Sequence, residues 1–125
     1  MIKLGIKKIE YRSSENDNNW IELKTVHLSA TLTEEWSEEA AGKYSTVKVN
    51  AQIRNSSKTM DLILEYLSNL YWQYRITDMN GREYILGNSE YRANFNYSRS
   101  FGGLNANGYE ISIEYESPEG IKASN

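Results

Sequence analysis

The chain contains few of the residue types that do catalytic or metal chemistry. It has no cysteine and a single histidine, His27. One histidine cannot form a two-histidine metal site, and no serine or aspartate is spaced around it as in a catalytic triad. Because His27 lies between Val26 and Leu28, we interpret it as an ordinary strand residue. We therefore predict a protein that is not an enzyme and has no cofactor or metal.

The acidic stretch 33–43 is a candidate for a site of another kind. Its four glutamates are Glu34, Glu35, Glu38 and Glu39, and they surround Trp36. In a short helix ending at Gly42 they would form like-charged i, i+4 pairs, which favour a bound cation or a basic partner. In a protruding hairpin they would form a solvated acidic loop. Both conformations remain open; we favour the solvated loop over a metal site, and we expect an exposed Trp36 to anchor a neighbouring protein.

Two glycine-containing stretches resemble ligand-binding loops only superficially. The stretch 78–81, DMNG, lacks the D-x-[DN]-x-[DN]-G spacing of a calcium loop and the glutamate that closes it. Its Asn80-Gly81 pair predicts a tight type I′ hairpin instead. The glycines of the stretch 101–108 are followed by a predicted strand and by no Lys-Ser or Lys-Thr pair. We therefore expect no phosphate site there, because no helix N-terminus follows the glycines.

Aromatic residues recur in the second half of the chain and allow two interpretations. They include Trp72, Tyr74, Tyr91, Phe95 and Tyr97. On an exposed sheet face they could stack against sugars, which would make the protein a monomeric glycan-binding module. Their period-two placement is also what the core of a sheet requires. We favour the core and keep the glycan platform as the alternative function.

Alternating apolar residues predict the strands that position these side chains. Strands are expected at 2–11, 21–32, 47–53, 71–77, 82–86, 91–97 and 109–115. Within 21–32 the apolar phase changes near Thr25 and Val26, which predicts a bulge or a sharp bend. In the last strand, Glu110, Glu114 and Glu116 should point outward.

One helix is expected, at about 58–70. Its buried stripe has i, i+3, i+4, i+7 spacing, and a second apolar row runs beside the stripe. The stripe consists of Met60, Ile63, Leu64 and Leu67, and the row of Leu62, Tyr66 and Leu70. Either the helix lies deep against the sheet or the row contacts another subunit. The predicted fold is a mainly β single domain over 1–125: an antiparallel β-sandwich or flattened barrel of about seven strands, with the helix on one open side and a loose C-terminal tail from about 121.

Charge and hydropathy argue against two classes of partner. The net charge is −3, from 17 acidic and 14 basic residues, and the basic residues are scattered among acids instead of forming the stripe of a nucleic-acid-binding protein. No apolar run approaches the ~20 residues that cross a bilayer. The N-terminal residues alternate as in a strand and do not resemble a secretory signal. We expect synthesis in a bacterial cytoplasm, no sequence-specific nucleic-acid binding and no membrane binding.

The run YWQYRITDMNGREYILGNSEYRANFNYSRSFGG, followed by NGYEISIEYESPEG, resembles small virion proteins of tailed phages and prophages of Bacteroidetes-type hosts. The resemblance covers about residues 71–120. It implies a β-sandwich or barrel with one flanking helix that works in the neck or tail of the virion, as a head-tail connector, tail terminator or tail tube. Such a protein forms a ring around the DNA channel with copies of itself and contacts neighbouring virion proteins.

A ring subunit needs surfaces that meet its neighbours, and two are predicted. The first is the acidic stretch with Trp36. The second is an outward polar row on the predicted sheet, made of Tyr71, Gln73, Arg75, Arg92, Asn94 and Asn96. The outward acids of the last strand would also keep DNA from adhering if they face the channel.

Overall fold

The computed structural model describes residues 2–12, 19–25, 29–39, 42–54, 58–70, 73–88, 90–100 and 108–121. Four strands precede the helix α1 (Lys58–Leu70), namely β1 (Ile2–Arg12), β2 (Ile21–Leu23), β3 (Thr31–Glu39) and β4 (Gly42–Ile53). Four strands follow it, namely β5 (Gln73–Asp78), β6 (Glu83–Leu86), β7 (Asn94–Ser100) and β8 (Gly108–Ser117). The protein is therefore mainly β with one helix, and the helix has the predicted bounds.

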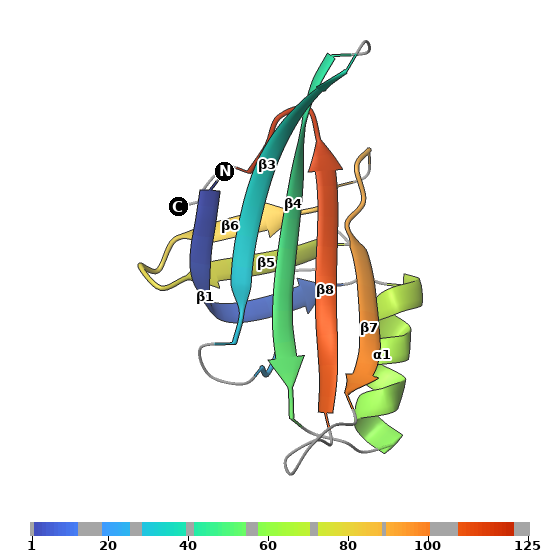
Figure 1. Ribbon diagram of the computed structural model, residues 1–125. Helices are drawn as coiled ribbons and strands as arrows, with labels where there is room; N and C mark the ends of the chain where they lie inside the picture. Colours follow the sequence, from blue (N-terminus) through green and yellow to red (C-terminus); the bar gives the residue numbers. More distant parts are fainter. Residues whose placement is uncertain are drawn as a thin grey trace.

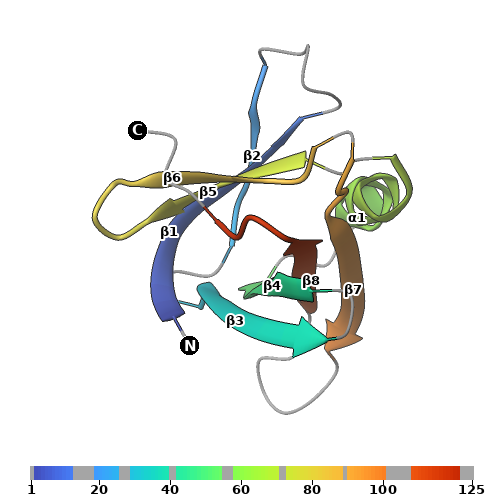
Figure 2. The ribbon, with the colours of Figure 1, turned by 90° about the horizontal axis from the view of Figure 1, so that it is seen from above.

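The strands form one open antiparallel sheet that curls into two layers. Its order is β6-β5-β1-β3-β4-β8-β7, and β2 also pairs with β1. β1 belongs to both layers, because its first half pairs with β3 and its second half with β5 and β2. The register shifts between Ile6 and Lys8, where an irregularity can bend a strand. Figures 1 and 2 show β1 turning from the layer of β3, β4, β8 and β7 into a second layer with β5 and β6. This half-barrel confirms the predicted fold class.

The core lies between the two layers and follows the predicted alternation. On β4 and β8 the buried apolar side chains are Val47, Val49, Ala51, Ile53, Tyr109, Ile111, Ile113 and Tyr115. Glu110 and Glu116 point outward and are exposed, and Glu114 is half-buried. The rings of Tyr74 and Phe95 stack inside the core with their centroids 6.0 Å apart. For these two aromatic residues the core interpretation is confirmed.

The helix α1 lies beside β7 on the open side of the half-barrel (Figure 2). Leu64 and Leu67 are fully buried. The hydroxyl of Tyr109 on β8 donates a hydrogen bond to the carboxylate of Asp61 and ties the helix to the sheet. Leu62 and Tyr66 are each 56% exposed, so this second apolar row does not pack against the sheet; the side chain of its third member, residue 70, is outside the described part of the chain.

The single strand expected at 21–32 is wrong, and part of the bulge or sharp bend expected near Thr25 and Val26 falls on residues 26–28, outside the described residues. β2 ends at Leu23 and β3 begins at Thr31, so the segment 21–32 forms two strands instead of one irregular strand. Both pair with β1, β2 along its second half and β3 along its first. The phase change in the sequence therefore marks the change from one layer to the other, and it raises the number of strands to eight. His27 lies outside the described residues.

The hairpin around Asn80 also differs from its prediction. Gly81 N–H donates to the Asp78 carbonyl (3.1 Å) and Asp78 N–H to the Arg82 carbonyl (2.9 Å), which leaves a three-residue connection instead of a two-residue type I′ turn. Within this connection Gly81 has a positive φ, of 86°. Such loops place a glycine in the left-handed region after a turn. The Asp78 carboxylate stabilises the loop by accepting from Asn80 N–H and Arg82 N–H, both at 2.9 Å.

Candidate functional site

Strands β3 and β4 extend beyond the rest of the sheet as a two-stranded ribbon. β1 pairs with β3 only as far as Glu34, and β8 pairs with β4 only from Ser45 onward. Pairing between β3 and β4 continues to Glu39 and Gly42. Figure 1 shows this ribbon, residues 35–39 and 42–44, projecting past the other strands. The acidic stretch is therefore part of a hairpin, and the alternative of a short helix is wrong.

The structure places the predicted acidic residues on two different sides of this hairpin. Glu35 and Glu38 are exposed, and Trp36 is 52% exposed, as predicted. The side chain of Glu39 lies outside the described part of the chain. Glu34 is only 4% exposed, so its prediction as a surface residue is wrong. Glu34 is buried because it lies at the same alternating positions of the strand as Ala30 and Leu32, whose side chains point inward.

Glu34 belongs to a group of hydrogen-bonded residues that we call the clasp; its other members are Ser45, Ser117, Gly120 and Ile121. Its Oε2 atom accepts a hydrogen bond from the Ser45 hydroxyl (2.8 Å) and another from the backbone N–H of Ile121 (2.9 Å). Gly120 N–H donates to the Ser117 hydroxyl at 3.1 Å. These bonds hold the C-terminal segment against β3 and β4. Ile121 is thus fixed against β3, and the residues after it, 122–125, on which the predicted C-terminal tail falls, lie outside the described residues.

The indole of Trp36 lies against the clasp. A Cβ atom added to Gly120 would be 2.7 Å from Cζ2 of Trp36 and 2.8 Å from Oε2 of Glu34. Gly120 also has a φ of +74°, which side chains other than glycine rarely adopt. One edge of Trp36 is thus supported by its own chain, while the rest of the ring stays exposed at the base of the ribbon.

The other predicted surface does not exist as one row. Gln73 is only 3% exposed; its amide donates to the Gly87 carbonyl at 3.0 Å and its oxygen accepts from Arg12. Tyr71 lies outside the described residues. β5 and β7 are also separated by four strands in the sheet. The residues predicted on these two strands therefore belong to different layers.

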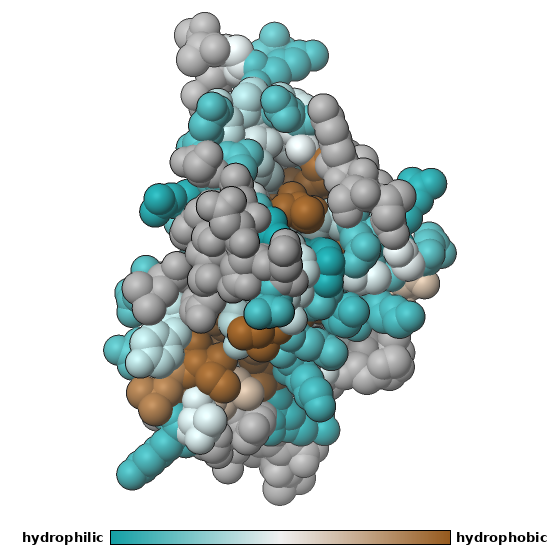
Figure 3. All heavy atoms as spheres, turned by 180° about the vertical axis from the view of Figure 1, so that it is seen from behind, coloured by the Kyte–Doolittle hydropathy of each residue, from teal (hydrophilic) through white to brown (hydrophobic). Residues whose placement is uncertain are grey.

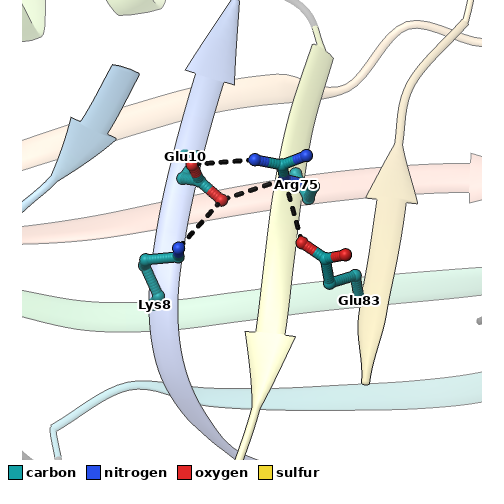
Figure 4. Close-up of polar contacts among 4 residues, drawn as sticks. All are labelled: Lys8, Glu10, Arg75 and Glu83. Carbon is teal, nitrogen blue, oxygen red and sulfur yellow. Dashed lines mark hydrogen bonds and ion pairs between the residues drawn. The ribbon is translucent and has the colours of Figure 1, made fainter. Parts of the chain in front are cut away.

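Arg75 forms an ion-pair network on the outside of the β1–β5–β6 layer (Figure 4). Its Nε and Nη2 atoms donate to the two carboxylate oxygens of Glu10, each at 2.9 Å. Lys8 lies 3.6 Å from Glu10, and Glu83 lies 3.3 Å from Arg75. The hydrogen bonds from Arg75 lower the pKa of Glu10 despite its burial, and they raise the pKa of Arg75. The network fixes three strands together, a role that sequence spacing cannot reveal.

The ring of Trp20 completes this cluster. The guanidinium carbons of Arg12 and Arg75 lie 4.2 Å and 4.7 Å from its ring centroid. Cation–π contacts of this kind contribute roughly 0.5–1 kcal/mol at exposed sites. Trp20 therefore links the segment before β2 to β1 and β5.

The residues predicted on β7 are exposed, as expected. They are Asn94 and Asn96 on β7 and Arg92 just before it. In the antiparallel register Asn94 lies opposite Glu114 and Asn96 opposite Ser112. The register of β8 with β4 extends this face further, to Lys48 and Asn50. The outer face of this layer is therefore polar and formed by several strands.

A pocket of about 530 Å³ opens at the end of the molecule opposite the ribbon. Its residues come from β1, β2, the end of β4 and α1. The apolar ones are Tyr11, Leu23, Ile53, Met60 and Ile63, and the polar ones are Glu22, Lys24, Thr25 and Arg54. Figure 3 shows hydrophobic residues gathered at the surface on the side of the molecule where α1 lies. No local motif marks this pocket, because its lining residues come from four segments that are separated in the sequence.

The described residues hold neither a metal-binding cluster nor a membrane-spanning helix. Those residues contain no group of three or more histidine, cysteine, aspartate or glutamate side chains placed to hold a metal ion. Among the same residues, no helix has both the length and the apolar character to span a membrane. Comparison of the chain with protein-family models, with curated proteins and with solved structures finds no match.

Proposed function

We propose that this protein is a non-enzymatic structural subunit of a tailed-phage virion, in the neck or tail, which assembles with copies of itself into a ring around the DNA channel. The observation that carries the proposal is the ribbon. An isolated two-stranded hairpin is marginally stable in water at best. The ribbon extends past the end of the pairing with β1 on one side and past the end of the pairing with β8 on the other. Contact with a neighbouring subunit would stabilise it and cover Trp36, which is 52% exposed.

A second apolar feature supports a subunit in an assembly. Leu62 and Tyr66 lie one helical turn apart on α1, and each is 56% exposed. Single exposed apolar residues are common on protein surfaces, but adjacent ones with an exposed tryptophan elsewhere favour several contacts with neighbours. The sequence resemblance over 71–120 supports the proposal that this assembly is the virion neck or tail.

The polar outer face of β7, β8 and β4 is the surface that we assign to the channel. It carries Glu110, Glu114 and Glu116, and Lys48 lies opposite Glu114. Carboxylates facing DNA repel its phosphates and allow the duplex to slide. A channel wall of this kind makes no contacts with DNA bases and needs no stripe of basic residues. The scattered Lys and Arg residues of this chain agree with that.

Electron microscopy of the purified full-length chain tests the proposal. We expect closed rings with a central opening whose wall is the outer face of β7, β8 and β4. Rings with Glu110, Glu114 and Glu116 on the outside would contradict the assignment of the channel face. A particle that remains a monomer and binds on a glycan array would contradict the proposal itself and favour the glycan-binding alternative.

A further inference from the structure

The pocket opposite the ribbon is a part of the apolar core that reaches the surface. Its apolar lining consists of Tyr11 of β1, Leu23 of β2, Ile53 at the end of β4, and Met60 and Ile63 of α1. The first three are buried core residues, and the two helix residues are half-buried and pack against the same core. Its volume of about 530 Å³ is in the range of roughly 300–1,000 Å³ of small-molecule sites, which recur at the mouths of β-barrels. The opening therefore has the size and the lining of a site for a small apolar ligand.

The inner lining favours a hydrocarbon body. Apart from Tyr11, the apolar residues that line the pocket have aliphatic or thioether side chains, and the flexible side chain of Met60 can adapt to different shapes. Among the described lining residues, the other neutral hydroxyl belongs to Thr25, which is half-buried. A polar body that must be held by several hydrogen bonds finds few partners here, whereas a hydrocarbon chain gains by leaving water. We therefore expect the buried part of the ligand to be a hydrocarbon tail.

Two cations from different strands stand at the rim of the pocket. Lys24 follows β2 and Arg54 follows β4, each directly after a buried lining residue, Leu23 or Ile53. Both cations are exposed, and neither side chain forms an ion pair with another described residue. An ammonium and a guanidinium both bind carboxylates through charge-assisted hydrogen bonds. The rim can therefore hold an anionic head group while the tail enters the core.

The acids beside the pocket already have positions of their own. Glu22 lies opposite Glu10 in the antiparallel register of β1 and β2, so it belongs to the outer face of the layer, where Arg75 binds Glu10. In the first turn of α1, the carboxylate of Asp61 accepts a hydrogen bond from the hydroxyl of Tyr109. Of the described charged residues at the rim, the two cations therefore remain to meet a ligand.

We propose that this pocket binds a fatty-acid-like ligand, with its hydrocarbon tail between Leu23, Ile53 and the first two turns of α1 and its carboxylate between Lys24 and Arg54. The site lies at the opposite end of the molecule from the ribbon. It adds a ligand-binding activity to the proposed function and does not depend on that function.

Titration calorimetry of the full chain tests the class of ligand with three probes of equal chain length, each below its micelle concentration. They are decanoate, decanol and decyltrimethylammonium, which share the tail and carry a negative, a neutral and a positive head. We expect decanoate to bind most tightly, decanol about 10-fold more weakly, and decyltrimethylammonium more weakly than decanol. Equal affinities for the three probes, or no binding of decanoate, would overturn the proposal.

Exposed charge variants test the head-group site without disturbing the core. Lys24→Ala with Arg54→Ala should weaken decanoate binding by about 10-fold, the equivalent of ~1.4 kcal/mol shared between two exposed ion pairs, and leave decanol binding unchanged. The matched control is Lys48→Ala with Arg92→Ala, which removes the same charges from the outer face of β4 and from the residues before β7. The control should bind decanoate like the wild type, and an equal loss in both double variants would contradict the site.

A filled pocket tests where the tail lies. Met60→Trp adds a bulky ring to a half-buried lining position and should abolish the binding of decanoate and decanol alike. Circular dichroism checks that the variant keeps its fold. A folded Met60→Trp chain that binds decanoate like the wild type would place the tail elsewhere and overturn the proposal. If the variant does not fold, the exposed charge variants decide the question by themselves.

Discussion

The guanidinium of Arg75 on β5 holds the carboxylate of Glu10 on β1 through two hydrogen bonds of 2.9 Å. The Glu10 side chain is 9% exposed and that of Arg75 25%, so the pair lies between a surface ion pair and a buried one. Surface pairs contribute roughly 0.2–1 kcal/mol, and breaking a buried pair costs about 3–5 kcal/mol. The pair joins the strand that bends between the layers to the centre of the second layer.

Arg75→Ala should lower the free energy of unfolding by about 1–3 kcal/mol, because it leaves the largely desolvated carboxylate of Glu10 without its main donor. Arg75→Lys should recover only part of the loss, since an ammonium cannot make the two parallel hydrogen bonds. Urea denaturation measures both. Lys48→Ala, an exposed lysine on the other layer, is the control and should stay within about 0.5 kcal/mol of wild type. Equal losses for Arg75→Ala and Lys48→Ala would contradict the structural role of the network.

The same pair predicts how stability depends on pH. Hydrogen bonds from Arg75 lower the pKa of Glu10 in the folded protein, so the unfolded chain binds a proton more readily than the folded one. The stabilisation is complete above the ordinary glutamate pKa of roughly 4.3 and is lost as the pH falls through the lower folded value. Glu10→Gln should therefore flatten the acid limb of the stability curve, as measured by thermal unfolding at a series of pH values. An unchanged acid limb would show that Glu10 is not the group responsible.

The clasp predicts a loss of stability when Glu34 is replaced. Glu34→Ala leaves the Ser45 hydroxyl and the Ile121 N–H without their acceptor, and a buried unsatisfied donor costs about 1–3 kcal/mol. Glu34→Gln keeps one acceptor oxygen and should cost less. Limited proteolysis should also cleave the C-terminal segment faster in Glu34→Ala. If cleavage and stability are unchanged, the segment does not depend on Glu34.

Gly120 and Gly81 form a matched pair for the contact with Trp36. Both have positive φ angles, 74° and 86°, but a Cβ at Gly81 would meet nothing within 4 Å. Gly81→Ala should therefore cost only the backbone strain of about 1–2 kcal/mol, and Gly120→Ala should cost more. In a Trp36→Ala background the cost of Gly120→Ala should fall, a coupling that a double-mutant cycle in urea measures. Equal costs at the two glycines, with no coupling, would place Trp36 away from the clasp.

Much of the fold was accessible from local pattern, whereas the surfaces were not. The helix bounds and the inward rows of β4 and β8 follow from periodicity, which reports burial directly. The burial of Glu34 could also have been predicted, because Glu34 alternates in phase with the buried Leu32. Its charge suggested an outward position instead. Gln73 could not be placed, because its burial depends on Arg12 and Gly87, which are distant in sequence. The pocket could not be predicted either, because its lining residues also come from segments that are distant in sequence.

The mass of the wild-type chain in solution tests the central claim, that this is an assembling subunit, most directly. Size-exclusion chromatography with light scattering, run over increasing protein concentration, should show a multiple of 14.4 kDa that approaches a fixed ring mass. Trp36→Ala, measured beside it with the same circular dichroism spectrum, should remain near the monomer mass. A wild-type chain that stays at the monomer mass up to its solubility limit would contradict the claim.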